Sequence, residues 1–571
     1  MRRRLSFSWA TLAVLLGSLA LLASACGTSG TGSILPPNQQ ILKIALNAGG
    51  QDISTLDPAV TQDVYSYQIE QQLFPQLYTW DAHLNVIPWA ASALPTVSSD
   101  GLTYTIPIRT GMKWSDGTPI DANTFAYSLN RQLDPCTATV LAGFFLAPIK
   151  GATAFNGSKC DAPASAIDPV DSKTLIGTSI IVQDPQTLVI KLAAPATYFL
   201  AALTTSSSMA MPKQLITQYG LKDWINHLQG FGGSQYELKL WDHRGSLDVV
   251  ANPNFWGGEP KLHEVDWTIY KDPKTGYTDY LNGRLDVASP SIDQYTSAKT
   301  RSDFFEGPSL SMGYISPNWA VAPMNDVRAR QAFDLALDKT VLANNIQKGT
   351  VFASNHMIPQ GNPGYNPNLT GPDGQVNDLS GNPTLAKQLM QQYANAHCGG
   401  SFAKCPTLNY YTTNDTGSLE LSNAILNQWR TTFPGFPITE TPVTFPQLLK
   451  AITSASPPAA WLIGYAVDYA DPQDWTSLQA LPPADGGGNN LSNINDPQAN
   501  KLMLQGNTMP NGPARYAVYQ QAEQSLVTQV AWITLDQAKL FWVATPKLHG
   551  FSFTPNLFPT FSTWQNAYLT S

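Results

Sequence analysis

Residue patterns that support catalysis are the first feature to test, because most hydrolases and transferases need nucleophiles, bases or metals at fixed spacing. The sequence has no Gly-x-Ser-x-Gly elbow, no His-Glu-x-x-His pair, no Gly-x-x-x-x-Gly-Lys phosphate loop and no Gly-x-Gly-x-x-Gly fingerprint. His263-Glu264 lacks the second histidine that a zinc site of that type requires. The many Asp and Glu residues could supply a glycosidase pair, but nothing in the sequence localises two of them. We therefore expect no enzyme, no cofactor and no metal.

The five cysteines can form covalent links. If Cys26 carries a lipid, four cysteines remain, and four cysteines allow three connectivities. The simplest pairs Cys136 with Cys160 and Cys398 with Cys405, and each bridge then closes a local loop. A zinc site is the alternative, although no Cys-x-x-Cys spacing or neighbouring histidine pair supports it. Because thiols of exported chains tend to oxidise, we predict the two disulfides.

The N-terminus has the pattern of an export signal. Arg2, Arg3 and Arg4 precede an apolar stretch over 9–25. Ala23-Ser24-Ala25-Cys26 resembles the lipobox where a bacterial lipoprotein is cleaved and its cysteine receives diacylglycerol. The alternative is an uncut signal anchor, since the stretch is near the lower limit of ~17 residues for spanning a bilayer. Both interpretations place the rest of the chain outside the cytoplasm. We expect a signal peptide over 1–25, lipidation of Cys26, and attachment to the outer face of the cytoplasmic membrane, which is periplasmic if there is an outer membrane.

Composition predicts a large globular protein beyond that signal. A Gly/Ser/Thr-rich run over 26–38 is typical of a flexible tether, so the folded body should begin near Gln39. The remaining length corresponds to three or four domain-sized units at about 150 residues each. Hydrophobic residues make up 43% of the chain, with 22 Tyr, 22 Phe and 15 Trp, which excludes a disordered chain. Only 13% of residues are charged, the net charge is -8, and the signal holds the only basic cluster, which excludes a nucleic-acid surface.

Several segments have clear signals of secondary structure. Apolar crowding favours a strand, a Gly-containing turn between extended stretches favours a hairpin, and an aspartate before a 3.6-residue apolar period favours a capped helix. The predicted elements are a strand over 41–46, a hairpin turn at Asp100-Gly101, a helix capped by Asp121 that buries Phe125, Ala126, Leu129 and Leu133, and a helix opening at Asp326 that buries Phe333, Ala336, Leu337 and Val341 and ends near Gly349.

Five ordered blocks carry a resemblance that runs from about Ile41 to the C-terminus. They resemble the family 5 extracellular solute-binding proteins, the dipeptide, oligopeptide and nickel type. The first block has proline and glutamine where an acidic residue is common, and in the third Gln235 replaces a proline. The blocks are Thr55-Leu56-Asp57-Pro58 with 72–78; Pro88 to Arg131, including Trp114-Ser115-Asp116-Gly117-Thr118-Pro119; Gly232-Gly233-Ser234-Gln235-Tyr236 with Asn252-Pro253-Asn254-Phe255-Trp256; Asn325 to Lys339, similar to "x-D-x-R-x-R-Q-A"; and Gly464-Tyr465-Ala466-Val467-Asp468-Tyr469-Ala470-Asp471-Pro472, similar to "G-W-x-x-D-Y-x-(D/E)-P".

The resemblance implies an α/β, bilobal fold of the periplasmic-binding-protein-like kind (type II, large cluster with an extra β-rich subdomain). Two chain crossings, near 307–316 and 531–537, would form the hinge. The expected division is lobe I over 39–80, 195–306 and 535–571, an inserted subdomain over 81–194, and lobe II over 307–534.

The resemblance also implies a ligand site. In peptide-binding members the aspartate of the last motif meets the free amino group of the ligand, and Asp468 is the matching position. An enclosed carboxylate needs a cation, and an ammonium supplies three donors. The alternative is that Asp468 caps the turn before Asp471-Pro472. Tyr465, Tyr469 and Trp475 could wall the pocket or belong to the ordinary core.

The residue that binds the ligand carboxylate is left open. Arg244, Arg328 and Arg430 have equal claims, while Arg328 and Arg330 also fit salt bridges within the fourth block. We expect a monomer that passes a short peptide to the permease subunits of an ABC importer. The alternatives are an oligosaccharide, a nickel chelate or another metabolite as cargo, an extracellular hydrolase, and a sensory or adhesive lipoprotein.

Overall fold

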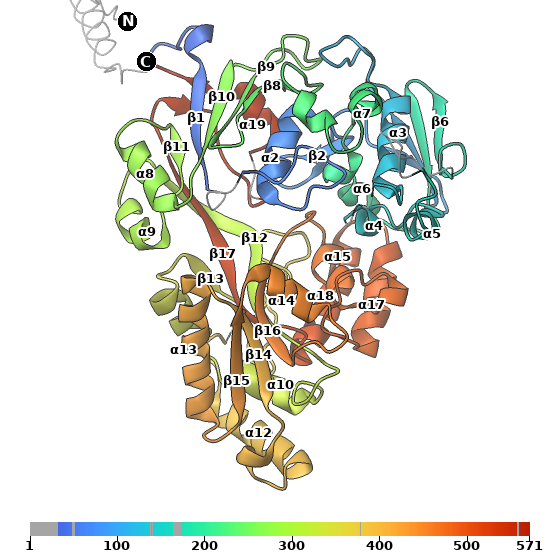
Figure 1. Ribbon diagram of the computed structural model, residues 1–571. Coiled ribbons are helices and arrows are strands. Elements are labelled where there is room, and N and C mark those ends of the chain that lie inside the picture. Colours follow the sequence, from blue (N-terminus) through green and yellow to red (C-terminus); the bar gives the residue numbers. More distant parts are fainter. Residues whose placement is uncertain are drawn as a thin grey trace, which may run out of the picture.

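The computed structural model describes residues 32–47, 52–137, 139, 141–163, 173–376, 378–556 and 559–571. The predicted signal peptide and Cys26 lie outside the described residues. Figure 1 shows two bodies joined by two long strands, β12 (Phe304–Pro317) and β17 (Ile533–Ala544). β12 contains the first predicted crossing, and β17 begins within the second. The α/β, bilobal fold class is therefore confirmed.

One sheet of 11 strands runs through both bodies. β12 and β17 pair antiparallel near its middle, so the two crossings are hydrogen-bonded to each other as well as to their own bodies. In order across the sheet the strands are β15 (Ile438–Val443), β14 (Leu408–Thr413), β16 (Ala460–Ala466), β12, β17, β11 (Val287–Ala288), β1 (Ile41–Leu46), β10 (Glu264–Ile269), β9 (Ser246–Ala251) and β8 (Tyr236–Trp241), and β13 (Val351–Ala353) pairs with β17.

Two separate hydrophobic cores support a division of the chain into two lobes. The first core contains Leu42 and Trp267, and the second contains Phe333 and Trp429. A third apolar cluster joins residues from both sides of the crossing. We propose the boundaries that the resemblance implies, which are 39–80, 195–306 and 535–571 for lobe I, 81–194 for the inserted subdomain, and 307–534 for lobe II.

The inserted part contains its own sheet of four strands. The predicted turn at Asp100-Gly101 is confirmed, and Gly101 has a φ of +72°, which favours glycine. The predicted helix after Asp121 is also confirmed, with a capping box formed by Asp121 and Thr124. The elements are β4 (Thr96–Val97), β5 (Thr103–Pro107), β7 (Thr187–Lys191), β6 (Ile180–Asp184), α3 (Ala122–Leu133), α4 (Ala142–Phe145) and α5 (Ala152–Asn156).

Helices and two short hairpins complete both lobes. Lobe I adds α2 (Val64–Leu73), α6 (Phe199–Ala202), α7 (Lys213–Tyr219), α8 (Pro273–Leu281), α9 (Ile292–Ala298), α19 (Phe561–Asn566) and the pair β18 (Leu548–His549) with β19 (Tyr568–Leu569). β2 (Tyr78–Trp80) at the end of the first lobe I segment pairs with β3 (Val86–Pro88) of the inserted subdomain. Lobe II adds α10 (Val327–Leu335), α11 (Lys339–Val341), α12 (Pro383–His397), α13 (Thr416–Thr432), α14 (Phe445–Ile452), α15 (Pro472–Trp475), α16 (Ser477–Ala480), α17 (Pro497–Thr508) and α18 (Pro513–Thr528).

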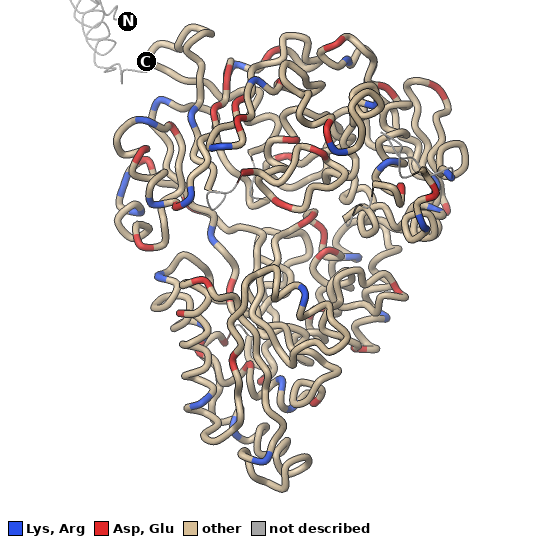
Figure 2. The backbone as a smooth tube through the Cα atoms, in the orientation of Figure 1, with Lys and Arg blue, Asp and Glu red and all other residues tan. Residues whose placement is uncertain are grey.

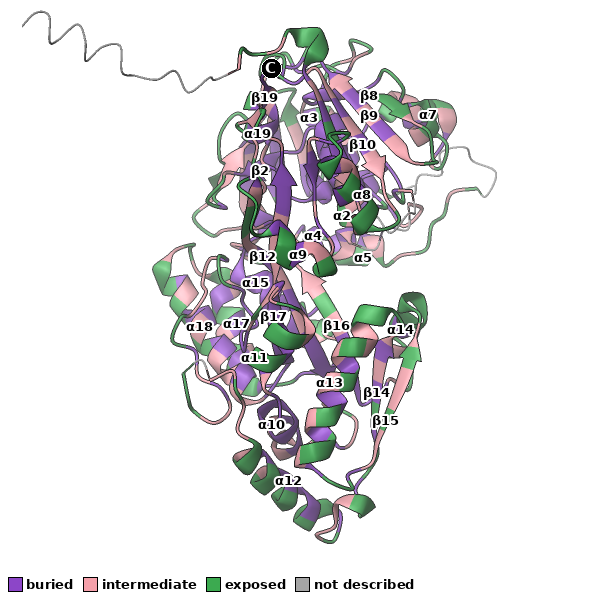
Figure 3. Ribbon diagram, turned by 90° about the vertical axis from the view of Figure 1, so that its left-hand side faces the viewer, coloured by how far each residue is buried: buried purple, intermediate pink, exposed green. Residues whose placement is uncertain are grey.

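Charged residues are spread over both bodies, whereas much of the two crossing strands is buried. Figure 2 shows acidic and basic residues interspersed along the chain in both bodies. Figure 3 shows buried residues along much of β12 and β17, whereas α12 and α13 each carry an exposed outer face. Among the described residues, no helix combines the length and the apolar character that crossing a bilayer requires.

The single helix predicted from Asp326 to near Gly349 is wrong. α10 begins after Asp326 as expected but ends at Leu335, and α11 begins after Asp338. The break occurs because the Asp338 carboxylate accepts the N–H of Val341 at 2.8 Å and so caps a second helix. Val341 is 40% exposed, contrary to the expected burial, whereas Phe333 is fully buried.

Two of the five blocks meet in a buried ion pair. Both terminal nitrogens of Arg131 donate to Asp57, at 2.7 Å each, and the indole N–H of Trp224 also donates to Asp57. In the third block the amide nitrogen of Gln235 donates to the carbonyl oxygen of Phe561 and to the Gln565 side chain, both at 2.9 Å. The residue that replaces a proline therefore holds α19 against the segment that leads into β8.

Two disulfides close local loops, and a hydrogen bond joins the N-terminal segment to the C-terminal segment. The structure pairs Cys136 with Cys160 and Cys398 with Cys405. Within the predicted tether, Leu35 donates its N–H to the Leu569 carbonyl at 3.0 Å. The packed body therefore starts a few residues before Gln39.

Candidate functional site

β16 carries the last sequence block to the place where the lobes meet. It pairs antiparallel with the crossing strand β12, so that Tyr465 lies opposite Met312. Just beyond the end of β16, the Val467 N–H donates to the Leu310 carbonyl at 2.9 Å. This pairing holds Asp468, the next residue, beside the hinge.

Asp468 lines a cavity of about 100 Å³ between the lobes. Lobe I contributes the residues before α2 and its first turn, the segment after α6, and Asn556. The inserted subdomain contributes α4 and its preceding residue, and lobe II contributes the loop after β16. The lining residues are Thr61, Gln62, Asp63, Val64, Tyr67, Leu141, Phe145, Thr205, Ser206, Val467, Asp468 and Asn556.

The Asp468 carboxylate is held by neighbouring polar groups. The Tyr465 hydroxyl lies 2.6 Å from Asp468 Oδ2 and 2.8 Å from Asp474 Oδ1. The Asp468 N–H donates to Asp474 Oδ2 at 3.1 Å. Burial raises the pKa of Asp468 to about 6, so at neutral pH the carboxylate still predominates. A carboxylate enclosed between two lobes can bind a cationic group that enters from the cleft.

The structure separates the predicted aromatic residues into two groups. Tyr465 contacts Asp468 directly. Trp475 is fully buried behind Tyr465, with ring centroids 5.3 Å apart, and its indole N–H donates to Asn362 at 3.2 Å. Tyr469 is 2% exposed, and its ring packs edge-on against Phe145. Tyr469 and Trp475 therefore belong to the packed wall behind the cavity.

The turn-capping role considered for Asp468 belongs to Asp471. The Asp471 carboxylate accepts the N–H of Gln473 at 2.9 Å and begins α15. It also receives both terminal nitrogens of Arg515, at 2.7 and 2.8 Å. Asp468 therefore does not cap this helix.

None of the three arginines considered for the ligand carboxylate lines this cavity. Arg244 and Arg430 are exposed, and Arg328 forms an ion pair with Asp326 at 2.5 Å. The salt bridge expected for Arg330 is replaced by other contacts. Arg330 lies over the Trp319 ring at 3.7 Å and donates to the carbonyl oxygens of Met324 and Gln529. Burial lowers the pKa of Arg330 to about 10.

Sequence reasoning missed the lobe I side of the cavity and one acid of lobe II. Thr61, Tyr67 and Thr205 lie in segments without a charge pattern, so no local signal marked them. Asp474 lies two residues after Asp471-Pro472. An acidic residue so close to the last block could have been considered as part of the site.

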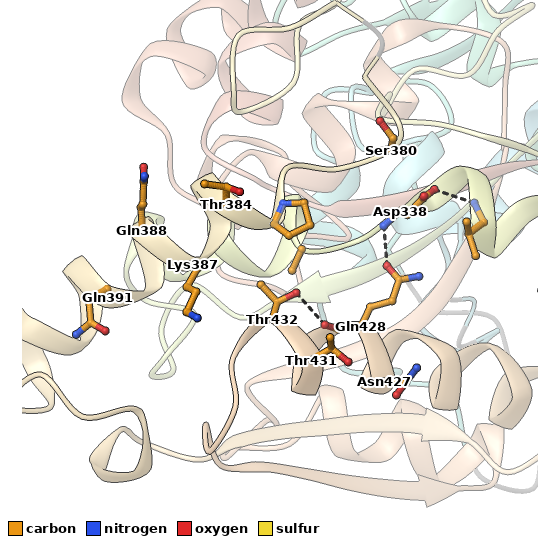
Figure 4. A pocket seen from close by; sticks show the side chains of 13 residues that line it. Asp338, Ser380, Thr384, Lys387, Gln388, Gln391, Asn427, Gln428, Thr431 and Thr432 are labelled. Atoms are coloured by element: carbon orange, nitrogen blue, oxygen red, sulfur yellow. Dashed lines mark hydrogen bonds between the residues drawn. The ribbon is translucent and has the colours of Figure 1, made fainter.

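A larger hollow lies elsewhere. Figure 4 shows polar side chains of α12 and α13, among them Lys387, Gln428 and Thr432, that line it. Its volume is about 900 Å³. All of its lining residues come from lobe II, so a ligand there would not contact both lobes. Of these two hollows of the described residues, the cavity at Asp468 is the one lined by both lobes, so a ligand there would contact both.

Three carboxylates form a cluster on lobe I. Asp248 on β9 and Glu264 and Asp266 on β10 place one oxygen each within 4.8 Å of one another. Lys239 of β8 pairs with Glu264, and burial raises the pKa of Asp266 to about 7. A lysine and a carboxyl with a raised pKa reduce the negative charge of this cluster.

Comparisons with known proteins bear on the family and on the fold. Residues 85–486 match the family described as bacterial extracellular solute-binding proteins, family 5 Middle. The chain is 23% identical over 550 residues to the oligopeptide-binding protein OppA of Bacillus subtilis, covering 95% of this chain and 96% of the relative. The structure resembles that of the Escherichia coli murein tripeptide binding protein MppA, with a TM-score of 0.74, 21% identity, and 93% and 98% of the two chains covered. It also resembles Haemophilus influenzae OppA in complex with RPPGFSPFR, with a TM-score of 0.73, 18% identity, and 94% and 100% covered.

Proposed function

The chain belongs to the bacterial extracellular solute-binding proteins, family 5, and we propose that it captures a short peptide between its lobes and delivers it uncut to an ABC importer. The observation that carries the proposal is the position of Asp468 in a cavity lined by both lobes. Asp63 and Asp468 are the acidic residues among the described lining residues, and none of the lining residues is basic. Such a cavity favours the ammonium end of a ligand.

Hydrogen bonding on the lobe I side supports the choice of Asp468, rather than Asp63, as the anchor. The Asp63 carboxylate already accepts the N–H groups of Tyr65 and Ser66, at 3.0 and 2.8 Å, because it caps α2. Asp468 Oδ1 accepts no hydrogen bond from any of the residues described around it, and Oδ2 receives only Tyr465. An ammonium with three donors therefore finds its free acceptor at Asp468.

Movement of the lobes on β12 and β17 would admit the ligand. The cavity of about 100 Å³ has room for the amino end of a peptide rather than for a whole peptide. A ligand that contacts Asp468 in lobe II and Tyr67 or Thr205 in lobe I favours the closed arrangement, because its contacts with both lobes exist only there. Exclusion of water strengthens the polar contacts.

Relatives support a peptide as the cargo. One relative is named an oligopeptide-binding protein, one similar structure a murein tripeptide binding protein, and another contains the peptide RPPGFSPFR. The family is one of solute-binding proteins, so we expect the ligand to leave unchanged.

The ligand is identified by mass spectrometry of the small molecules released when the purified protein is denatured. We expect a mixture of short peptides, and much less peptide from Asp468→Asn purified in the same way. Synthetic peptides incubated with the protein should stay intact. Release of an oligosaccharide, or cleavage of the peptides, would replace this proposal with one of its alternatives.

We also propose a lipid anchor at Cys26, a position on the outer face of the cytoplasmic membrane, and a monomeric protein. The export pattern before Cys26 supports the anchor. In the producing cell, Cys26→Ala should lose incorporation of labelled fatty acid and move from the membrane to the soluble extracytoplasmic fraction. An unchanged distribution would favour the uncut signal anchor.

A further inference from the structure

The Tyr465 hydroxyl lies between two carboxyl groups. Its oxygen is 2.6 Å from Asp468 Oδ2 and 2.8 Å from Asp474 Oδ1. A phenol carries one hydrogen and can donate to only one of these oxygens. Both separations are those of O–H···O hydrogen bonds, and the second contact is a full hydrogen bond only where the carboxyl group itself carries a hydrogen. This geometry fits three side chains that hold one proton more than the tyrosine supplies.

Burial decides which carboxyl group carries the extra proton. Asp474 is 0% exposed, whereas Asp468 lines the cavity. Asp474 Oδ2 accepts the N–H of Asp468 at 3.1 Å, which leaves Oδ1 to carry the hydrogen that faces Tyr465. Loss of solvation and the charge of Asp468 raise the pKa of Asp474 well above its ordinary range. Burial raises the pKa of Asp468 only to about 6.

The charged surroundings supply no cation that would keep Asp474 ionised. Arg515 of α18 donates both terminal nitrogens to Asp471, so the positive charge is already paired. No ion pair of Asp474 with a lysine, arginine or histidine occurs among the described residues. Several titratable groups surround the network. They include Asp468, Asp471, Tyr465 and Tyr469 on its own segment, Arg515 on α18, Tyr198 beside α6, and Asp63 and Tyr67 across the cavity.

We propose that Asp474 is a neutral carboxylic acid that donates its hydrogen bond to Tyr465, which in turn donates to Asp468. This relay fixes Oδ2 of Asp468 and leaves Oδ1 open toward the cavity. Asp474 touches no ligand and is a positioning residue. Its effect on binding rests on the proposed function, because the relay matters for binding only if Asp468 meets the ligand.

The binding experiment compares two substitutions at position 474 by titration calorimetry with trialanine. Asp474→Ala removes the donor and the acceptor, and we expect the affinity to fall roughly tenfold, as for the loss of one strong hydrogen bond. Asp474→Asn keeps a donor for Tyr465 and an acceptor for the Asp468 N–H, so it should recover most of that loss. Asp468→Asn removes the charge that meets the ligand, so its affinity for trialanine should stay low. Equal damage from Asp474→Asn and Asp468→Asn would show that Asp474 acts as a charge and would overturn the proposal.

A second experiment needs no ligand and so separates this proposal from the proposed function. The unfolded chain ionises Asp474 above about pH 4, whereas the folded chain keeps it neutral, so folding takes up a proton. The stability that Asp474 contributes is complete below that pH and is lost as the pH rises toward the folded pKa. The Tm of Asp474→Asn relative to the native protein should therefore rise between about pH 5 and about pH 8.

Asp485→Asn, at an exposed aspartate outside the network, controls for the loss of one carboxyl group. A Tm difference for Asp474→Asn that does not change with pH would mean that Asp474 is ionised in the folded protein, and the relay would be wrong. The Tm difference for Asp474→Asn could rise with pH while Asp468→Asn binds peptide as well as the native protein does. That pair of results would support a neutral Asp474 and would contradict the role of Asp468 as the amine anchor.

Discussion

Gly313 on β12 faces Asp536 on β17 where the two crossing strands pair, and a Cβ on Gly313 would lie 2.8 Å from the Asp536 carboxyl oxygen. Asp536 is 6% exposed and accepts a hydrogen bond of 2.6 Å from the Gln347 side chain. Burial raises the pKa of Asp536 to about 7. The hinge thus packs a carboxyl group into space that only a glycine leaves free.

Gly313→Ala should destabilise the protein by roughly 1–3 kcal/mol, because the added methyl group forces the carboxyl group or the strands apart. Urea unfolding measures the loss. Gly307→Ala is a matched control on the same strand, since a Cβ there has no atom within 4 Å. Similar unfolding free energies for the two variants would mean that Asp536 moves aside without cost.

Local sequence predicted the elements whose signals are local. The strand over 41–46, the turn at Asp100-Gly101 and the helix after Asp121 depend on periodicity, glycine and capping within one segment. The helix from Asp326 was predicted too long, because the apolar period continues across Asp338 while the cap that breaks the helix depends on a single side chain.

The site was predictable only in part for the same reason. Asp468 and Tyr465 lie in one motif, and the resemblance marked them. Thr205 and Tyr67 reach the cavity only through the folding of distant segments, so nothing near them in the sequence indicated a site. The proton shared around Tyr465 depends on distances between side chains, which a sequence does not specify.

Asp468→Asn should weaken binding of an unblocked tripeptide by about 2–5 kcal/mol, because a buried charged pair loses one partner. N-acetylated peptide lacks the ammonium, so its affinity, weak from the start, should change little. Titration calorimetry with both peptides on both proteins measures the difference. Equal losses for the two peptides would remove the amine-anchor assignment.

Peptide affinity should depend on pH with a midpoint near the pKa of Asp468, which is about 6 in the free protein. Below that pH Asp468 takes up a proton and loses the charge that attracts the ammonium, so affinity falls by up to tenfold per pH unit. Above it the carboxylate is complete, and affinity stays level until the peptide amine loses its own proton near pH 8. Asp468→Asn should not show this fall in peptide affinity at low pH. A native protein with constant affinity from about pH 7 to about pH 5 would contradict the assignment.

Arg515→Met tests the buried ion pair that supports the wall behind the site. The Arg515 side chain is 0% exposed and gives both terminal nitrogens to Asp471, so its removal leaves a buried carboxylate without its cation. We expect a loss of about 3–5 kcal/mol in the free energy of unfolding. Arg284→Met at the exposed pair with Asp279 is the control and should cost under about 1 kcal/mol. The double variant Arg515→Met, Asp471→Asn should regain part of the loss, because it removes the unpaired charge. If the double variant were no more stable than Arg515→Met, the cost would come from lost packing of the arginine stem rather than from the stranded carboxylate.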